Sequence, residues 1–200
     1  LGQAMLLAKS EKNDSALCSV YNGMGLYTSN IHKDYYSALH YFFEGIEAAH
    51  RCHYKELEAI LLGNISSIYF LKEDPAGLTY SLQTYEMGHE QNSAYLIFIG
   101  ALNASYMYYL LHDYDKALPY IKEAEFIMKQ NEYYNQGNVY AIYGMIEFAK
   151  GNRQQAIEYY KKGLALNDMN QTSYKVLLLN EYAIALAEEG KNQQAIDLLF

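Results

Sequence analysis

The chain has 200 residues, of which 51% are hydrophobic and 19% are charged, so it can bury a core of its own. Its formal net charge of −8 argues against a nucleic-acid-binding surface, because such a surface needs clustered lysine and arginine. No segment is rich in proline, glycine and serine together, which argues against a flexible linker within the chain.

Five segments share one pattern around a small residue. In chain order they read DYYSALHYF, EDPAGLTYS, DYDKALPYI, NRQQAIEYY and KNQQAIDLL. Their central small residues are Ala38, Gly77, Ala117, Ala156 and Ala195, at intervals of 39, 40, 39 and 39 residues. A fixed period in this range predicts a solenoid of stacked repeats.

Each repeat reads as two helices joined by a turn. After the central residue, apolar side chains recur at helical spacing, and a second small residue such as Gly45 or Ala124 follows seven positions later. Small side chains at both positions let a neighbouring helix approach closely. Before the central residue, another helical stretch ends in a polar or glycine turn, where glycine can adopt the left-handed conformation that ends a helix.

The expected elements therefore follow the repeat. In chain order they are the tail of a preceding helix over 1–11 and five helix pairs over 14–52, 54–91, 93–131, 133–168 and 171–200. We expect one all-α domain over 1–200, folded as a right-handed superhelix in which each pair contacts only its neighbours. Apolar faces at the two ends of the array would favour self-association or a covering domain.

One run within the third repeat requires a choice between two structures. Residues 93–111, SAYLIFIGALNASYMYYLL, carry no charge and are long enough to span a bilayer. Gly100, Asn103 and Ser105 interrupt the run, and it falls in register with the repeat. We interpret it as a buried helix, with a membrane span as the alternative.

The repeated positions resemble the tetratricopeptide repeat family. The resemblance is clearest in the fourth repeat. There Gly144 is the small residue of the first helix and Gly151 is the turn glycine. Ala156 is the small residue of the second helix, and the aromatic Tyr160 follows it. The third repeat has His112 at the turn glycine, while the first and second repeats have a loop one residue longer and one residue shorter.

The period is longer than the family's common repeat of about 34 residues. This longer form resembles the repeats of bacterial signalling and transcription regulators. The resemblance implies a domain that binds a peptide or protein and that adjoins a separate output domain.

Metal binding and catalysis are the competing interpretations of the polar residues. His50, Cys52 and His53 lie close together in sequence, but a structural zinc site normally needs four ligands, so we interpret them as a solvated helix end. Glu188 with Glu189, and Asp113 with Asp115, fall at turns where acidic residues commonly cap helices.

No phosphate-binding loop and no hydrolase motif occurs in the sequence. We therefore expect no enzymatic activity, no catalytic residue, no cofactor and no metal within this span. An enzyme that depends on His50 or His53 remains the third alternative.

The resemblance also implies that the first helix of each pair lines the inner surface of the superhelix. The candidate ligand contacts at such positions are Phe70, Asn103, Tyr106, Tyr109, Asn138, Met145, Phe148 and Asn180. Such a groove would be aromatic and apolar with few charges, which suits an amphipathic helix or an extended peptide. Asn64 belongs with the other asparagines as a possible partner for a ligand backbone.

Two alternatives limit this assignment. The same aromatic side chains could pack only between helices, because aromatic residues are enriched in cores as well as at binding sites. The groove also lacks the basic cluster with which chaperone-binding members of the family hold a terminal carboxylate.

The leading hypothesis is therefore the sensing and interaction region of a bacterial signal-transduction or transcriptional regulator. Its partner would be a peptide or protein, without nucleic-acid binding or a membrane span in this domain. The alternative is a stand-alone scaffold or co-chaperone that assembles other proteins.

The ends of the chain and its two cysteines bear on where it acts. The sequence opens without Met inside an expected helix and stops before a helix that begins near Asn192 could finish, so we expect an excerpt of a longer protein. Cys18 and Cys52 are too few for a disulfide framework and favour a reducing compartment. We expect a cytoplasmic location, or a periplasmic one if a signal or membrane segment lies outside the excerpt.

Overall fold

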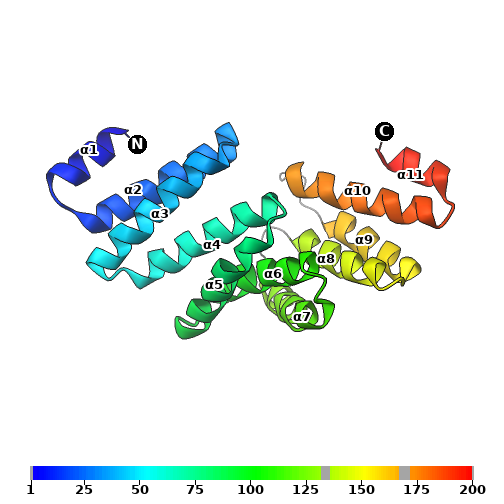
Figure 1. The fold of residues 1–200 in the computed structure, drawn as a ribbon. Helices are drawn as coiled ribbons and strands as arrows, with labels where there is room; N and C mark the ends of the chain where they lie inside the picture. The colour runs from blue at the N-terminus through cyan, green and yellow to red at the C-terminus, as the bar shows by residue number, and fades with distance from the viewer. Residues whose placement is uncertain (1, 132–135, 167–171, 200) are drawn as a thin grey trace. The chain divides into compact units, whose positions relative to one another are not determined.

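The computed structural model describes residues 2–131, 136–166 and 172–199, and within them it contains helices and turns but no strand. Helices that follow one another along the chain pack in antiparallel pairs (Figure 1). The prediction of an all-α helical-repeat solenoid is confirmed. The chain divides into two compact units, Leu1–Met107 and Tyr108–Phe200.

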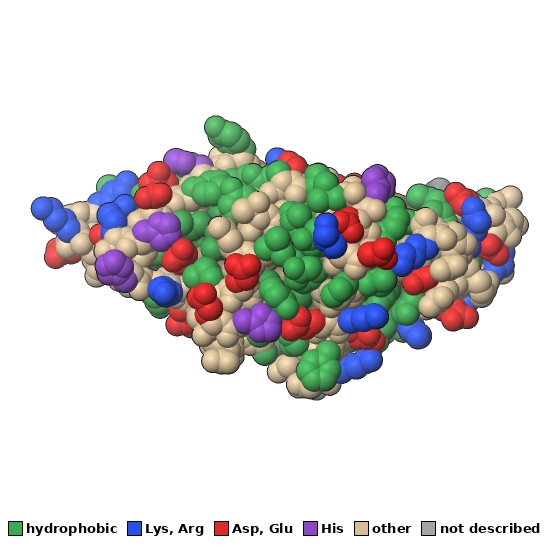
Figure 2. Space-filling model, turned by 60° about the horizontal axis from the view of Figure 1, so that its bottom comes forward, with side chains coloured by type: hydrophobic (Ala, Val, Ile, Leu, Met, Phe, Trp, Pro, Cys, Tyr) green, Lys and Arg blue, Asp and Glu red, His purple; other side chains and the backbone are tan. Residues whose placement is uncertain are grey.

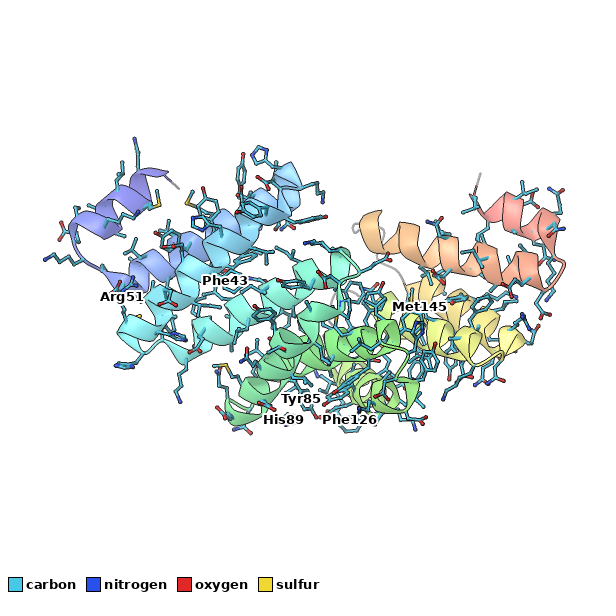
Figure 3. The ribbon with its side chains drawn as sticks, viewed as in Figure 1. Phe43, Arg51, Tyr85, His89, Phe126 and Met145 are labelled. Atoms are coloured by element: carbon cyan, nitrogen blue, oxygen red, sulfur yellow. The ribbon has the colours of Figure 1, made fainter. Side chains whose placement is uncertain are left out.

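The first unit holds the first two repeats and most of the next helix. Its helices are α1 (Gly2–Ser10), α2 (Asp14–Tyr27), α3 (Tyr35–Cys52), α4 (Lys55–Leu71), α5 (Leu78–Glu90) and α6 (Ala94–Leu110), of which the last three residues belong to the second unit. Each of α1 to α4 packs on the helix that follows it, and α2 also touches α4. At the end of α3, the Arg51 guanidinium reaches Asp14 of α2 at 2.7 Å (Figure 3).

The second unit repeats the same arrangement. Its helices are α7 (Tyr114–Gln130), α8 (Gln136–Ala149), α9 (Arg153–Leu166), α10 (Thr172–Glu188) and α11 (Asn192–Leu199). Each packs on the next, and α8 also touches α10. The contact between first helices of successive repeats therefore occurs in both units.

The small residues at the centre of each repeat allow this close packing. Ala38, Ala117 and Ala156 are fully buried, and Gly77 is buried as well. The first-helix glycines are equally constrained, since a Cβ on Gly144 would overlap the ring of Tyr160. A larger side chain at these positions would force the paired helices apart.

The turns within the repeats share one backbone conformation. A left-handed residue ends the first helix at Lys33, Glu73, His112, Gly151 and Gly190, with φ of 55°, 53°, 59°, 84° and 74°. The following aspartate, Asp34, Asp74 or Asp113, accepts a hydrogen bond from a backbone N–H of the next helix. His112 therefore adopts the turn conformation although glycine is absent there, and Asp113 is a capping residue as expected.

Two unusual helical turns absorb the loop-length differences of the first two repeats. The extra residue of the first repeat falls in a π-helical turn, η1 (Thr28–His32), which continues α2. The loop of the second repeat, which is one residue shorter, contains a 3-10 turn, η2 (Pro75–Gly77), that leads into α5. A π-turn takes up more residues per turn than an α-helix, and a 3-10 turn fewer, so the register of the helices is kept.

The uncharged run of the third repeat forms α6. Ten of its residues are buried, from Leu96 to Met107, so the interpretation as a buried helix is confirmed. Among the described residues, no helix combines the length and hydrophobicity that crossing a bilayer requires. On the face shown in Figure 2, acidic and basic side chains are interspersed among the hydrophobic ones, and the described residues form no extended basic area there.

Candidate functional site

The first helices of the first three repeats are joined by hydrogen bonds between amide and hydroxyl side chains. Asn64 Nδ2 on α4 donates to Asn22 Oδ1 on α2 at 2.8 Å. Asn103 Nδ2 on α6 donates to Ser66 Oγ at 2.7 Å and to Ser67 Oγ at 3.3 Å, both on α4. These polar contacts lie within the first unit and fix the spacing of α2, α4 and α6.

Part of this network is open to solvent. Asn22, Ile60, Asn64 and Ser67 are each half-buried, and we call these four residues the amide face. Ile60, Asn64 and Ser67 follow at intervals of four and three residues, so they share one side of α4. The bond between Asn22 and Asn64 uses one donor and one acceptor, which leaves Asn22 Nδ2 and Asn64 Oδ1 for a ligand.

The helices around the amide face carry very little charge. No lysine or arginine occurs in α2 or α6, and the only one in α4 is Lys55 at its first residue. Glu56 and Glu58 also lie in that first turn, away from Asn64. The face can therefore offer hydrogen bonds and apolar contact, but it has no cluster of cations that would attract a carboxylate or phosphate.

A pocket of about 660 Å³ lies beside the start of α4. Its lining residues are Lys55, Glu56, Ile60, Gln91, Ser93, Tyr95 and Leu96. Gln91 Nε2 donates to the main-chain oxygen of Lys55 at 3.1 Å, which ties the turn between α5 and α6 to the beginning of α4. Ile60 lines the pocket and lies one helical turn before Asn64 on α4, so the pocket lies next to the amide face.

Most of the residues predicted from sequence lie in the core. Five of the eight candidates are buried: Phe70, Asn103, Tyr106, Asn138 and Met145. The rings of Phe70 and Tyr106 pack with their centroids 4.1 Å apart. Met145, which is labelled in Figure 3, is a buried residue of α8. These side chains offer a ligand almost no surface in this conformation.

The remaining three candidates are more accessible. Tyr109 on α6 and Phe148 on α8 are half-buried, and Asn180 on α10 is exposed. They belong to the second unit, whereas the amide face belongs to the first. Within the first unit the structure brings together Phe70 with Tyr106, and Asn103 with two serines.

Among the residues that the structure describes in the second unit, two buried polar groups lack a hydrogen-bond partner. They are Asn138 Nδ2 and the Tyr160 hydroxyl, on side chains that are 4% and 0% exposed. Burial, followed by the charge of Glu181, raises the pKa of Tyr160, so this hydroxyl stays protonated. Both groups are enclosed, and neither is placed to reach a ligand.

Stacked tyrosine pairs recur through the repeats, although the sequence pattern was not interpreted as predicting them. A tyrosine follows the central small residue by three positions in four repeats and stacks on a tyrosine of the preceding helix. The pairs are Tyr21–Tyr41, Tyr69–Tyr80, Tyr108–Tyr120 and Tyr143–Tyr159, with centroids 6.4, 5.5, 5.6 and 4.9 Å apart. The tyrosine that recurs three positions after the central residue was the signal for this packing, which involves eight of the chain's 23 tyrosines.

The residues considered for metal binding and catalysis make structural contacts. His50 Nε2 lies 2.9 Å from Glu58 Oε1, and Glu188 pairs with Arg153 at 3.0 Å. Cys18 is fully buried, and burial, with the nearby Cys52 and Glu58, raises its pKa to about 11. Within the part of the chain that the structure describes, no three His, Cys, Asp or Glu side chains are grouped as metal ligands.

Comparison with known proteins gives one informative match. No family model matches the chain. The chain is similar to response regulator aspartate phosphatase J of Bacillus subtilis (strain 168), with 25% identity over 151 residues. The match covers 72% of this chain and 39% of that protein, so the chain corresponds to well under half of its relative. The helical-repeat fold is a finding of the structure, and the tetratricopeptide assignment stays a resemblance.

Proposed function

We propose that the chain is the peptide-binding or protein-binding module of a bacterial signalling regulator. The observation that carries this proposal is the half-exposed Asn22–Asn64 pair, which presents a spare donor and a spare acceptor on helices whose charged residues lie only in the first turn. The similarity to a protein named for its action on response regulators supports the regulatory part of the proposal.

An extended peptide is the ligand that best matches the amide face. The main chain of a peptide carries one N–H donor and one C=O acceptor per residue, and a paired asparagine can satisfy both. The half-buried Ile60 beside the pair can contact an apolar side chain. A highly charged ligand would gain little here, because the middle of α2, α4 and α6 offers it no counter-ion.

Binding at this face would act on the spacing of successive repeats. A ligand bonded to both Asn22 and Asn64 would bridge α2 and α4, which belong to different repeats. In a solenoid each repeat contacts only its neighbours, so a small change at one junction reorients everything beyond it. The ligand would then favour the conformation in which the distance between α2 and α4 lets it bond to both asparagines.

We further propose that these residues bind rather than catalyse. The relative is named as a phosphatase, but the chain corresponds to only 39% of it, so the match does not carry that activity over to this chain. Two free cysteines, Cys18 and Cys52, suit the reducing cytoplasm that we propose as the compartment. The alternative function is a stand-alone scaffold that assembles other proteins, and no specific observation favours it.

The test is selection of short random peptides by display on the full chain, followed by calorimetry with the synthetic peptides. We expect Asn64→Ala to weaken binding about tenfold and the double change with Asn22→Ala to weaken it further. Asn30→Ala on the exposed π-turn is the matched control and should bind normally. Failure to select any peptide, or equal affinity in all variants, would rule out the proposal.

A further inference from the structure

The pocket beside α4 has an apolar floor and a mouth of mixed charge. Its apolar lining residues are Ile60, the buried Leu96 and Tyr95, and Tyr95 is 52% exposed. Lys55 and Glu56 follow one another at the mouth and leave it without net charge. A charged ligand group would meet one attractive and one repulsive neighbour, whereas an apolar group would gain by leaving water.

The pocket is also held in shape without a ligand. The Gln91 amide bonds to the Lys55 carbonyl oxygen across the turn, and Ser93 Oγ accepts from the Leu96 N–H at the start of α6. Its volume of about 660 Å³ falls within the range of about 300 to 1,000 Å³ that is typical of ligand pockets. A preformed pocket costs less ordering on binding than one that the ligand must open.

The distance from the pocket to the amide pair sets a register for an extended ligand. Ile60 and Asn64 are one helical turn apart, which is about 6 Å along α4. An extended peptide covers that distance in about two residues. A side chain at that offset can therefore reach the pocket while the main chain two residues away bonds to the amide pair.

We propose that the pocket receives a large apolar side chain of the peptide ligand, two residues from the one whose main chain Asn22 and Asn64 hold. This inference rests on the proposed function and adds to it the ligand's sequence class. The ligand is an uncharged extended segment with one bulky apolar residue, leucine, methionine or an aromatic residue, at a fixed offset. The Ile60 side chain contacts that residue, and the Tyr95 ring covers it.

The experiment uses the synthetic peptides selected on the full chain. An alanine scan locates the side chain that binding needs, and a scan with N-methylated residues locates the N–H that Asn64 Oδ1 accepts. We expect that replacing the apolar residue of the peptide by alanine weakens binding at least about tenfold. That residue should lie two positions from the residue whose N-methylation weakens binding. The protein variant Ile60→Asp should weaken binding of the unmodified peptide to a similar degree. It should not change the affinity for the peptide in which alanine replaces the apolar residue.

Two further variants keep the result interpretable. Tyr95→Ala removes an exposed side chain, so it tests the pocket even if Ile60→Asp disturbs the fold, and helicity by circular dichroism monitors both. Ile196→Asp, at a residue that is 51% exposed on α11, makes the same chemical change outside the pocket and should have no effect. Peptides that respond to Asn64→Ala but to neither pocket variant would overturn the inference and leave the proposed function standing. Absence of any peptide binding would overturn both.

Discussion

Asn64 donates a hydrogen bond to Asn22, a residue 42 positions earlier, and so joins the first helices of two successive repeats. Asn64→Ala should lower the free energy of unfolding by about 1 kcal/mol, because the half-buried Asn22 amide then loses its partner. Since the two residues share one bond, the loss in the double variant with Asn22→Ala should be smaller than the sum of the single losses. Urea unfolding followed by circular dichroism measures this, and additive losses would show that the bond contributes nothing.

Asn103 and Asn138 are both buried, but they differ in their hydrogen bonds. Asn103 Nδ2 donates to two serines, whereas Asn138 Nδ2 has no partner. Asn103→Leu should therefore lower stability by about 1 to 3 kcal/mol, while Asn138→Leu should be neutral or stabilising because it removes an unpaired buried amide. The two midpoints of urea unfolding give the comparison. A loss at Asn138 as large as at Asn103 would mean that its amide is satisfied in solution.

The sequence predicted the helix pairs because their cause is local and repeated. A small residue recurs where two helices meet, and Ala38, Ala117 and Ala156 are indeed fully buried. The different loop lengths were visible as well. That a π-turn and a 3-10 turn would absorb them was not, since several backbone solutions can take up one residue.

The candidate site was predicted less well, for a physical reason. A residue's position on a first helix does not predict whether a neighbouring repeat buries its side chain. Phe70 and Tyr106, for example, pack against each other. Asn64 was considered, but Asn22 was missed because it lies three residues before its small residue, Gly25, while Asn64 lies two before Ser66. The pairing depends on how α2 and α4 pack, which the repeat register does not contain.

Gly144 and Gly63 occupy first helices with different amounts of space. A Cβ on Gly144 would overlap the ring of the fully buried Tyr160, whereas at Gly63 the nearest atom would be Thr84 Cγ2 at 3.4 Å. Gly144→Ala should destabilise the second unit by about 1 to 3 kcal/mol through overpacking. Gly63→Ala should be neutral or stabilise by up to about 1 kcal/mol, because alanine favours the helix. Thermal unfolding of both variants provides the measurement, and equal effects would contradict this packing.

Two of the left-handed turn residues should change stability in opposite directions when they are substituted. Glu73 has φ of 53° at an exposed turn, and Gly190 has φ of 74° at the equivalent turn, with open space where a Cβ would lie. Glu73→Gly should raise stability by about 0.5 to 1 kcal/mol, because relief of backbone strain exceeds the entropy that glycine adds to the unfolded chain. Gly190→Ala should lower stability by about 1 kcal/mol for the same reason. Melting temperatures that move in one direction for both variants would contradict the assigned conformations.

Glu125 of α7 is the partly buried carboxylate for which the structure predicts a pH dependence. Burial alone would raise the pKa of Glu125, but hydrogen bonds from Lys129 and Tyr143, and more weakly from Tyr140, hold it below its ordinary value. Because the folded pKa lies below the unfolded one, the carboxylate contributes stability above the unfolded pKa of about 4.3, and that contribution disappears as the pH falls through the folded pKa.

Glu125→Gln tests this contribution directly. At neutral pH the variant should be less stable than the parent by about 1 kcal/mol, since a neutral amide is a weaker partner for Lys129 and the two tyrosine hydroxyls. The difference should stay constant from about pH 8 to pH 5.5 and shrink below about pH 4.3, where the parent loses its own charge. Urea unfolding at a series of pH values measures it, with Glu189→Gln, at an exposed turn residue, as the control that should track the parent throughout. A difference between parent and Glu125→Gln that persists unchanged at the acid end would assign the effect to packing instead of charge.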